Sequence, residues 1–190
     1  MNEFLAYLWQ FGRLTPHQQE VVAQKATRVT LRKSDYFVEA GAVAQRVGFV
    51  EAGVLRVYSS TEQGEERTRY FIEEGHLILD VRAPGAPHPE APCLVQAVTA
   101  CRLVVFTAQQ WQTFFQLIPG WETIVHKIIA QAMREKMARV LPMVGQDAAA
   151  RYTSFLTNYP QLANRVPLTY LASYLGITPS SLSRVRKHIR

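Results

Sequence analysis

Residues 165–187, RVPLTYLASYLGITPSSLSRVRK, determine the fold of the C-terminal part of the chain. After Pro167, apolar residues recur at the spacing of a helix, and Gly176 then breaks the run. These apolar residues are Leu168, Leu171, Ala172 and Leu175. A second helix begins at Thr178–Pro179 and turns Leu182 and Val185 inward. Two helices joined by a tight turn at a glycine predict a helix-turn-helix.

The outer face of the second predicted helix is polar and basic, which suits the major groove of double-stranded DNA. The candidate DNA contacts on and before this helix are Thr178, Ser180, Ser181, Ser183, Arg184 and Lys187. The sequence therefore predicts a DNA-binding transcription regulator with double-stranded DNA as its partner.

The charge of the chain is concentrated near its C-terminus. The 190 residues hold 21 Lys and Arg against 15 Asp and Glu, for a formal net charge of +6. Residues 151–190 contain no acid, and their basic residues are Arg151, Arg165, Arg184, Arg186, Lys187 and Arg190. A basic segment can simply be a solvated end of the chain. Because this one coincides with the helix-turn-helix pattern, a surface that binds a polyanion is the favoured interpretation.

Composition predicts a cytoplasmic globular protein without a membrane partner. No apolar run approaches the roughly 18–20 residues that span a bilayer. The N-terminal MNEFLAYLWQF carries an acid and no basic segment, so we do not expect a secretory signal. Cys93 and Cys101 have no partner cluster and are interpreted as ordinary thiols rather than a regulatory disulfide.

The N-terminal part combines helices with short strands. Residues 2–27 predict one or two helices, with Thr15 as cap and Pro16 at the first helical position. From Val29 to Phe106 the hydrophobic period is two, and glycines separate short segments rich in Val, Phe and Tyr. Gln63–Gly64 predicts a hairpin turn, and the proline-rich residues 82–92 predict a loop. Many short strands with such turns predict a β-sandwich or barrel.

A long helix is predicted over residues 121–141, and its apolar stripe is wider than one small sandwich usually covers. This stripe could pack on the protein's own β-domain, but a homodimer seam is favoured because helix-turn-helix proteins commonly bind paired half-sites. The predicted seam residues are Trp121, Val125, Ile128, Ile129, Ala132 and Met133.

The predicted fold class is α+β, with a jelly-roll-like N-terminal β-roll as sensor domain, a long dimerisation helix and a C-terminal helix-turn-helix domain. The expected boundaries are residues 1–120 for the N-terminal helices and β-roll, 121–144 for the dimerisation helix and hinge, and 145–190 for the DNA-binding domain.

In this order of elements the chain resembles the Crp/Fnr superfamily of bacterial transcription regulators. The resemblance rests on residues 165–187 and on the turns VEAG, VEAGVLRVY and FIEEGHL, which contain Gly41, Gly53 and Gly75. It implies that Ser180 and Arg184 contact base edges, because the Arg fork can donate two hydrogen bonds to guanine. It also implies phosphate contacts for Thr178, Ser183 and Lys187.

Two departures limit what the resemblance implies about DNA. Well-known members carry a Glu at the position of Ser180, so their DNA sequence preference does not transfer to this chain. Members also continue into a β-hairpin wing, whereas this sequence ends at Arg190, about where the recognition helix ends. Either the wing is absent from the protein or this sequence stops short of it. Without a wing, we expect fewer backbone contacts and a shallower salt dependence of binding.

The resemblance further implies an effector pocket, but with a degenerate cyclic-nucleotide cassette. Asp80 aligns near the family's Glu, and Ala91 near the Arg that neutralises the cyclic phosphate. Because burying a phosphate without a cation is costly, control by cyclic AMP is not expected, although Arg82 could substitute. The candidates for lining a pocket for an unknown small-molecule effector are Leu79, Asp80, Arg82 and Gln96. No cofactor is expected, because the cysteine cluster of an iron–sulfur centre is missing.

An enzyme is the alternative, since a β-roll can also be a cupin-like enzyme or small-molecule module with an incidental basic tail. His76 and His88 are the only histidines of the β region and lack the paired spacing of such metal sites. No nucleophile setting or phosphate-binding glycine loop is recognisable. No catalytic residue and no metal site are therefore predicted.

Overall fold

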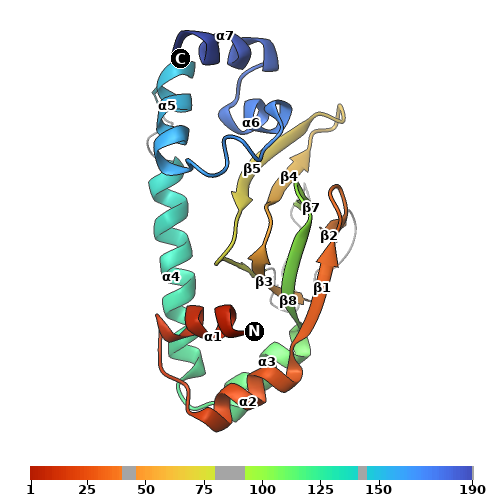
Figure 1. Ribbon diagram of the computed structural model, residues 1–190, viewed down its shortest axis with the longest axis vertical. Coiled ribbons are helices and arrows are strands. Elements are labelled where there is room, and N and C mark those ends of the chain that lie inside the picture. Colours follow the sequence, from red (N-terminus) through yellow and green to blue (C-terminus); the bar gives the residue numbers. More distant parts are fainter. Residues whose placement is uncertain (40–45, 80–92, 141–144, 190) are drawn as a thin grey trace.

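The computed structural model describes residues 1–39, 46–79, 93–140 and 145–189. Its helices are α1 (Asn2–Trp9), α2 (Pro16–Lys25), α3 (Ala108–Leu117), α4 (Trp121–Val140), α5 (Ala148–Asn158), α6 (Leu168–Leu175) and α7 (Pro179–Ile189). Its strands are β1 (Thr27–Leu31), β2 (Tyr36–Val38), β3 (Arg46–Ala52), β4 (Leu55–Ser60), β5 (Glu66–Ile72), β6 (Leu77–Leu79), β7 (Leu94–Ala97) and β8 (Cys101–Thr107). The predicted α+β order of β-roll, long helix and helix-turn-helix is confirmed (Figure 1).

Helices begin where the sequence provides caps. Thr15 accepts a hydrogen bond from the Gln18 backbone N–H, and the Gln18 side chain accepts one from the Thr15 N–H, which makes a capping box. Asp147 caps α5 by accepting from the Ala150 N–H. The helix start predicted at Thr15 is therefore confirmed.

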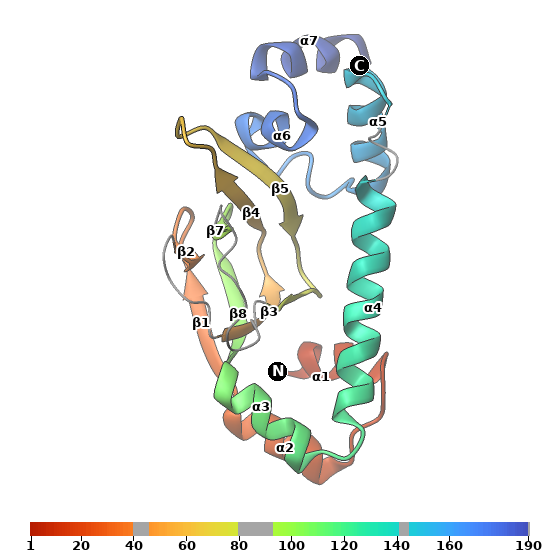
Figure 2. The same cartoon turned by 180° about the vertical axis from the view of Figure 1, so that it is seen from behind.

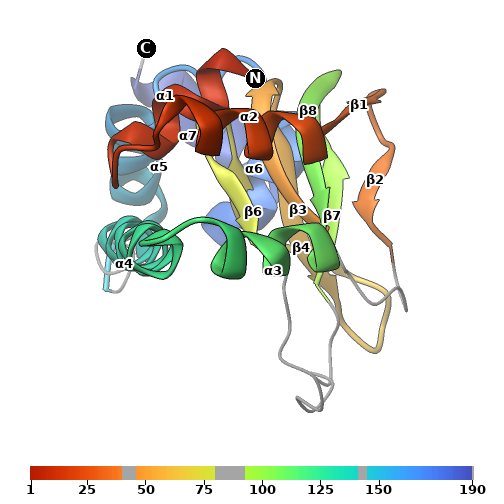
Figure 3. The same ribbon diagram turned by 90° about the horizontal axis from the view of Figure 1, so that it is seen from below.

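The β-roll consists of two four-stranded antiparallel sheets that face each other. Their strand orders are β1-β8-β3-β6 and β2-β7-β4-β5. The space between them is filled by apolar side chains from both sheets, among them Phe37, Leu55, Val57 and Leu103. Strands β3 and β8 are buried on both faces, since the outer face of their sheet packs on helices α1, α3 and α4 around Trp121. Figure 3 shows these helices from the end of the molecule near α2.

Two details of the strands differ from the sequence prediction. The β4–β5 hairpin closes with the Thr61 N–H donating to the Glu65 carbonyl, so its loop has three residues instead of two. Gly64 supplies the left-handed conformation in this loop, with φ of +81°. The apolar stretch 94–106 is broken at residues 98–100, and its two strands, β7 and β8, belong to different sheets. The predicted loop 82–92 lies outside the described residues.

Helix α4 runs along the length of the molecule beside the roll and leads to the C-terminal helices (Figure 2). Its 20 residues correspond to about 30 Å of helix. The C-terminal unit, residues 145–189, packs against the outer face of sheet β2-β7-β4-β5. Val54, Phe71 and Val98 of the roll share one hydrophobic core with the apolar residues of α5, α6 and α7. The unit is therefore docked on the roll, which the sequence analysis did not predict.

Candidate nucleic-acid interface

The turn between α6 and α7 has the geometry that the sequence predicted. Gly176 adopts φ of +68° and ψ of +33°, a left-handed conformation that ends α6, and the Ile177 N–H donates back to the Ala172 carbonyl. The Thr178 hydroxyl then caps α7 by accepting from the Ser181 N–H at 3.1 Å. Leu182 is fully buried beside α6 and fixes α7 in place. This part of the structure is a helix-turn-helix.

The predicted DNA-contacting residues divide into two groups. Thr178, Ser180, Arg184 and Lys187 are exposed, so their polar groups can meet a ligand. Ser181 and Ser183 are half-buried, and the Ser181 hydroxyl lies 2.9 Å from that of Thr178 and within 3.5 Å of the Arg184 guanidinium. We therefore regard Ser181 as part of the helix start that orders Thr178 and Arg184.

Arg151 and Arg165 of the C-terminal segment are engaged in contacts away from α7. Arg151 donates to the backbone carbonyls of Gln146 and Leu175, the latter at 2.8 Å, which satisfies the C-terminal end of α6. Arg165 makes a bidentate ion pair with Glu74 of the roll, with N–O distances of 2.6 and 2.9 Å. The excess positive charge available to DNA is therefore smaller than the sequence suggested, and it is concentrated on α7.

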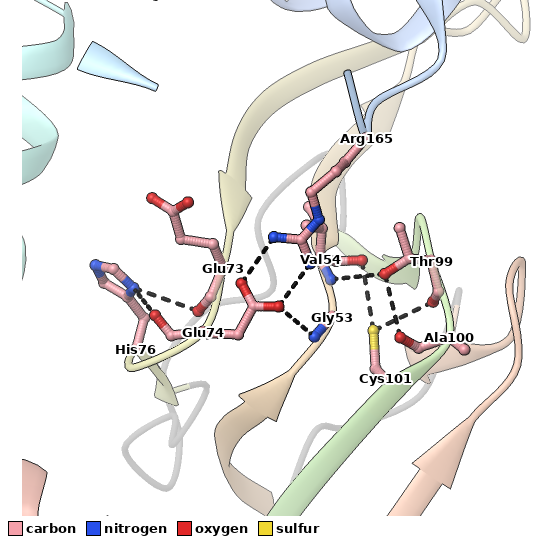
Figure 4. Close-up of polar contacts among 9 residues, drawn as sticks. All are labelled: Gly53, Val54, Glu73, Glu74, His76, Thr99, Ala100, Cys101 and Arg165. Carbon is pink, nitrogen blue, oxygen red and sulfur yellow. Dashed lines mark hydrogen bonds and ion pairs between the residues drawn. The ribbon is translucent and has the colours of Figure 1, made fainter. Parts of the chain in front are cut away.

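Glu74 is held by a second donor besides Arg165, as Figure 4 shows. The Gly53 N–H donates to the same carboxylate at 2.7 Å. The hydrogen bonds from Arg165, together with those from backbone N–H groups, outweigh partial burial and lower the pKa of the Glu74 carboxyl to about 2. Near this pair, burial raises the pKa of the Cys101 thiol, which donates weakly to the carbonyls of Val54 and Thr99.

The predicted dimer seam on α4 is divided between two faces of the helix. Trp121, Val125 and Ile128 are buried against the protein's own roll and N-terminal helix, with exposed fractions of 0, 7 and 2%. They therefore cannot line a surface between protomers in this structure. Ile129, Ala132 and Met133 are exposed, and the exposed apolar row continues through Met137 and Val140.

Comparison with known proteins identifies the fold. Residues 28–117 match the family model of the cyclic nucleotide-binding domain. FixK2 from Bradyrhizobium japonicum is 18% identical with a TM-score of 0.71, over 86% of this chain and 84% of that protein. The c-di-GMP-responsive global regulator CLP of Xanthomonas campestris is 16% identical with a TM-score of 0.71, over 92% of this chain and 91% of its own. This chain has a Crp/Fnr-type fold.

A putative Crp/Fnr-family transcriptional regulator from Eubacterium rectale shares the Crp/Fnr-type fold as well. It is 15% identical, with a TM-score of 0.73, over 96% of this chain and 87% of that protein. No curated protein matches the sequence significantly. The fold implied by the family resemblance is confirmed, since structures with 15 to 18% identity share it over most of the chain.

Of the residues predicted to line an effector pocket, the structure describes Leu79 and Gln96. Leu79 packs on the outer face of sheet β1-β8-β3-β6, toward the helices. Gln96 lies on the opposite, outer side of the other sheet, where it accepts from buried Arg56 and donates to the Ser34 carbonyl. These two residues therefore do not line one cavity. Asp80 and Arg82 lie outside the described residues.

Sequence reasoning missed Arg56, which is only 2% exposed. Its guanidinium donates to Gln96 and Glu66, both at 2.6 Å, and lies between the rings of Tyr58 and Tyr170, with centroids 4.0 and 3.6 Å away. Only the alternation along VLRVYSS indicated that Arg56 faces away from the roll interior. Nothing local indicated that α6 would cover it.

A cupin-like enzyme would need a cluster of metal ligands in the β-roll. Among residues 1–39, 46–79, 93–140 and 145–189, no three His, Cys, Asp or Glu side chains lie close enough to hold a metal ion. His76 instead contacts the backbone carbonyls of Glu73 and Glu74 and the carboxylate of Glu135.

None of the described helices has the length and apolar character needed to cross a membrane.

Proposed function

We propose that this protein is a dimeric, sequence-specific DNA-binding transcription regulator of the Crp/Fnr type, acting in the cytoplasm as a binding protein rather than an enzyme. The observation that carries the proposal is α7. It combines a capped N-terminus and a fully buried Leu182 with an exposed face of Ser180, Arg184 and Lys187. A rigid helix with an exposed polar and basic face is what insertion into the major groove requires.

The roles of the residues on α7 follow from their chemistry. The Arg184 guanidinium can donate two parallel hydrogen bonds to the O6 and N7 atoms of guanine. Ser180 can donate to or accept from several bases and therefore contributes less discrimination. Thr178, Ser183 and Lys187 are suited to phosphate contacts, which set the register of the protein on the duplex.

Dimerisation is proposed through the exposed apolar row of α4. Ile129, Met133, Met137 and Val140 are 44 to 54% exposed. Four large apolar side chains on one face of a helix are costly to leave in water, and a second copy of α4 would cover them. A two-fold dimer would also present two copies of α7 to paired half-sites.

We further propose that cyclic AMP does not control this protein. Among the described residues, the side chains packed between the two sheets form an apolar cluster that includes Phe37, Val38, Leu55 and Val95. A cyclic phosphate placed among such groups would need a cation, and Ala91 stands near the position of the family's phosphate-binding Arg. An effector of different chemistry remains compatible with the proposal.

The direct test is selection of genomic DNA fragments by the purified protein at physiological salt. The proposal predicts enrichment of one motif with two similar half-sites about 10 base pairs apart or a multiple of that spacing. Enrichment of no motif would count against the regulator and favour a β-roll protein whose basic C-terminal residues have no DNA-binding role.

A further inference from the structure

The contact between the C-terminal unit and the roll is specific and polar as well as apolar. Strand β5 lies at the edge of its sheet, and α6 covers that edge. The Thr68 backbone N–H donates to the Ser173 hydroxyl at 2.9 Å, and this hydroxyl donates to the Glu66 carbonyl at 2.9 Å. One serine of α6 thus takes the place of a neighbouring strand, which fixes α6 along β5.

The Glu74–Arg165 ion pair holds the same contact at the other end of β5. Glu74 follows β5, and Arg165 precedes α6 by three residues. Both guanidinium N–H groups point to the two carboxylate oxygens, and the Gly53 N–H holds the carboxylate from the roll side (Figure 4). Because the pair is bidentate and its carboxylate is already oriented, it is stronger than an isolated surface ion pair.

Docking does not cover the proposed DNA-binding face. The hydrogen bonds described between the C-terminal unit and the roll come from Ser173 of α6 and from Arg165 before it, whereas Ser180, Arg184 and Lys187 of α7 are exposed. In Figures 1 and 2, α7 lies at the end of the molecule remote from helices α2 and α3. The contact therefore fixes the direction of α7 relative to α4 without masking it.

We propose that Glu74 and Arg165 are positioning residues for DNA binding, whose ion pair holds the C-terminal unit on the roll and so pre-orients α7. This inference rests on the proposed function. A dimer must present both α7 helices about 34–36 Å apart to occupy adjacent half-sites. When the units are free to move, only a fraction of dimers has this geometry, and the apparent dissociation constant rises in inverse proportion to that fraction.

The test compares Glu74→Gln with Glu73→Gln in the full chain. Both variants lose one negative charge from the same turn, but only Glu74 is paired with Arg165. Docking is followed by hydrogen exchange of the Thr68 amide, which donates to Ser173. DNA affinity is measured on a duplex that carries the motif selected by the wild type. A charge effect alone would strengthen DNA binding in both variants.

The proposal predicts opposite behaviour of the two variants. In Glu74→Gln, the Thr68 amide exchanges about tenfold faster, and the dissociation constant for DNA rises about five- to tenfold. Glu73→Gln leaves the exchange rate of the Thr68 amide unchanged and binds DNA at least as tightly as wild type. Arg165→Lys keeps the charge but loses the fork, so it gives an intermediate loss in both measurements. It also provides the test if Glu74→Gln does not fold.

Faster Thr68 exchange in Glu74→Gln with unchanged or tighter DNA binding would overturn the positioning role and leave the proposed function intact. Unchanged exchange and unchanged affinity would show that the pair does not hold the unit. A wild-type protein that binds no DNA would overturn both proposals, while protection of the Thr68 amide would still report whether the C-terminal unit is docked.

Discussion

Gly53→Ala should destabilise the protein far more than Gly64→Ala, although both glycines have positive φ angles. Gly53 has φ of +102° in the turn between β3 and β4, and Gly64 has φ of +81° in the β4–β5 hairpin. A Cβ on Gly64 meets no atom within 4 Å. A Cβ on Gly53 would lie 2.6 Å from Cys101 Sγ and 2.8 Å from Cys101 Cα, and still closer to the Ala100 carbonyl oxygen.

The magnitude follows from two separate costs. The left-handed conformation costs an alanine about 1–2 kcal/mol at either position. At Gly53 the clash involves backbone atoms before and at the start of β8, which cannot rotate away, and such overpacking costs about 1–3 kcal/mol more. We therefore expect a loss of about 2–5 kcal/mol for Gly53→Ala and about 1–2 kcal/mol for Gly64→Ala.

Urea unfolding followed by circular dichroism measures both free energies of unfolding. With a denaturant slope of about 2 kcal/mol per molar, the midpoint of Gly53→Ala should fall by about 1 M or more below that of wild type. Gly64→Ala is the control for the conformational cost alone. Equal midpoints for the two variants would refute the packing described around Gly53 and Cys101.

Three further predictions concern the ion pair, the C-terminal core and the dimer. Because the folded-state pKa of Glu74 is lowered from 4.5 to about 2, its stabilisation is complete above pH 4.5 and is lost as the pH falls toward 2. Between about pH 5 and about pH 3, the free energy of unfolding measured in urea should therefore fall further for wild type than for Glu74→Gln. Equal falls in the two proteins would contradict the ion pair. Leu182→Ala should lower the free energy of unfolding by about 2–5 kcal/mol, because Leu182 is 0% exposed. Val185 is half-buried, so Val185→Ala should lower it less. A smaller loss for Leu182→Ala than for Val185→Ala would contradict the place of Leu182 in the core. Met133→Glu should convert the dimer into monomers, as measured by light scattering at micromolar concentration. Thr123 is exposed and lies away from the apolar row of α4, so Thr123→Glu should leave the dimer intact. A monomeric wild type would disprove the seam.

Local patterns predicted the elements of this fold well. Glycine at 176 and the Thr178–Pro179 start fixed the helix-turn-helix, because a left-handed turn and a helix cap are properties of neighbouring residues. The short segments rich in Val, Phe and Tyr between glycines predicted β3 and β4 for the same reason. The break at residues 98–100 could not be read from the sequence, since Val98, Thr99 and Ala100 include no Gly or Pro that would mark a turn.

The parts that depend on tertiary contacts could not be predicted. An apolar stripe on a helix indicates that one face is covered, but it does not identify what covers that face. Trp121 and Met133 were therefore assigned to the same seam, although Trp121 is 0% exposed and Met133 is 54% exposed. Likewise, the sequence counted Arg165 toward DNA because its partner, Glu74, is 91 residues away. Buried Arg56 depends on α6, which follows it by more than 100 residues.

The central claim is that α7 recognises DNA sequence through Arg184. The decisive measurement is the affinity of wild type, Arg184→Ala and Lys187→Ala for the selected duplex and for a scrambled duplex at the same salt concentration. Arg184→Ala should lose about 1–3 kcal/mol of discrimination, which lowers the ratio of specific to scrambled affinity about 5- to 150-fold. Lys187→Ala should weaken both duplexes alike and preserve the ratio. A ratio unchanged by Arg184→Ala would contradict the account.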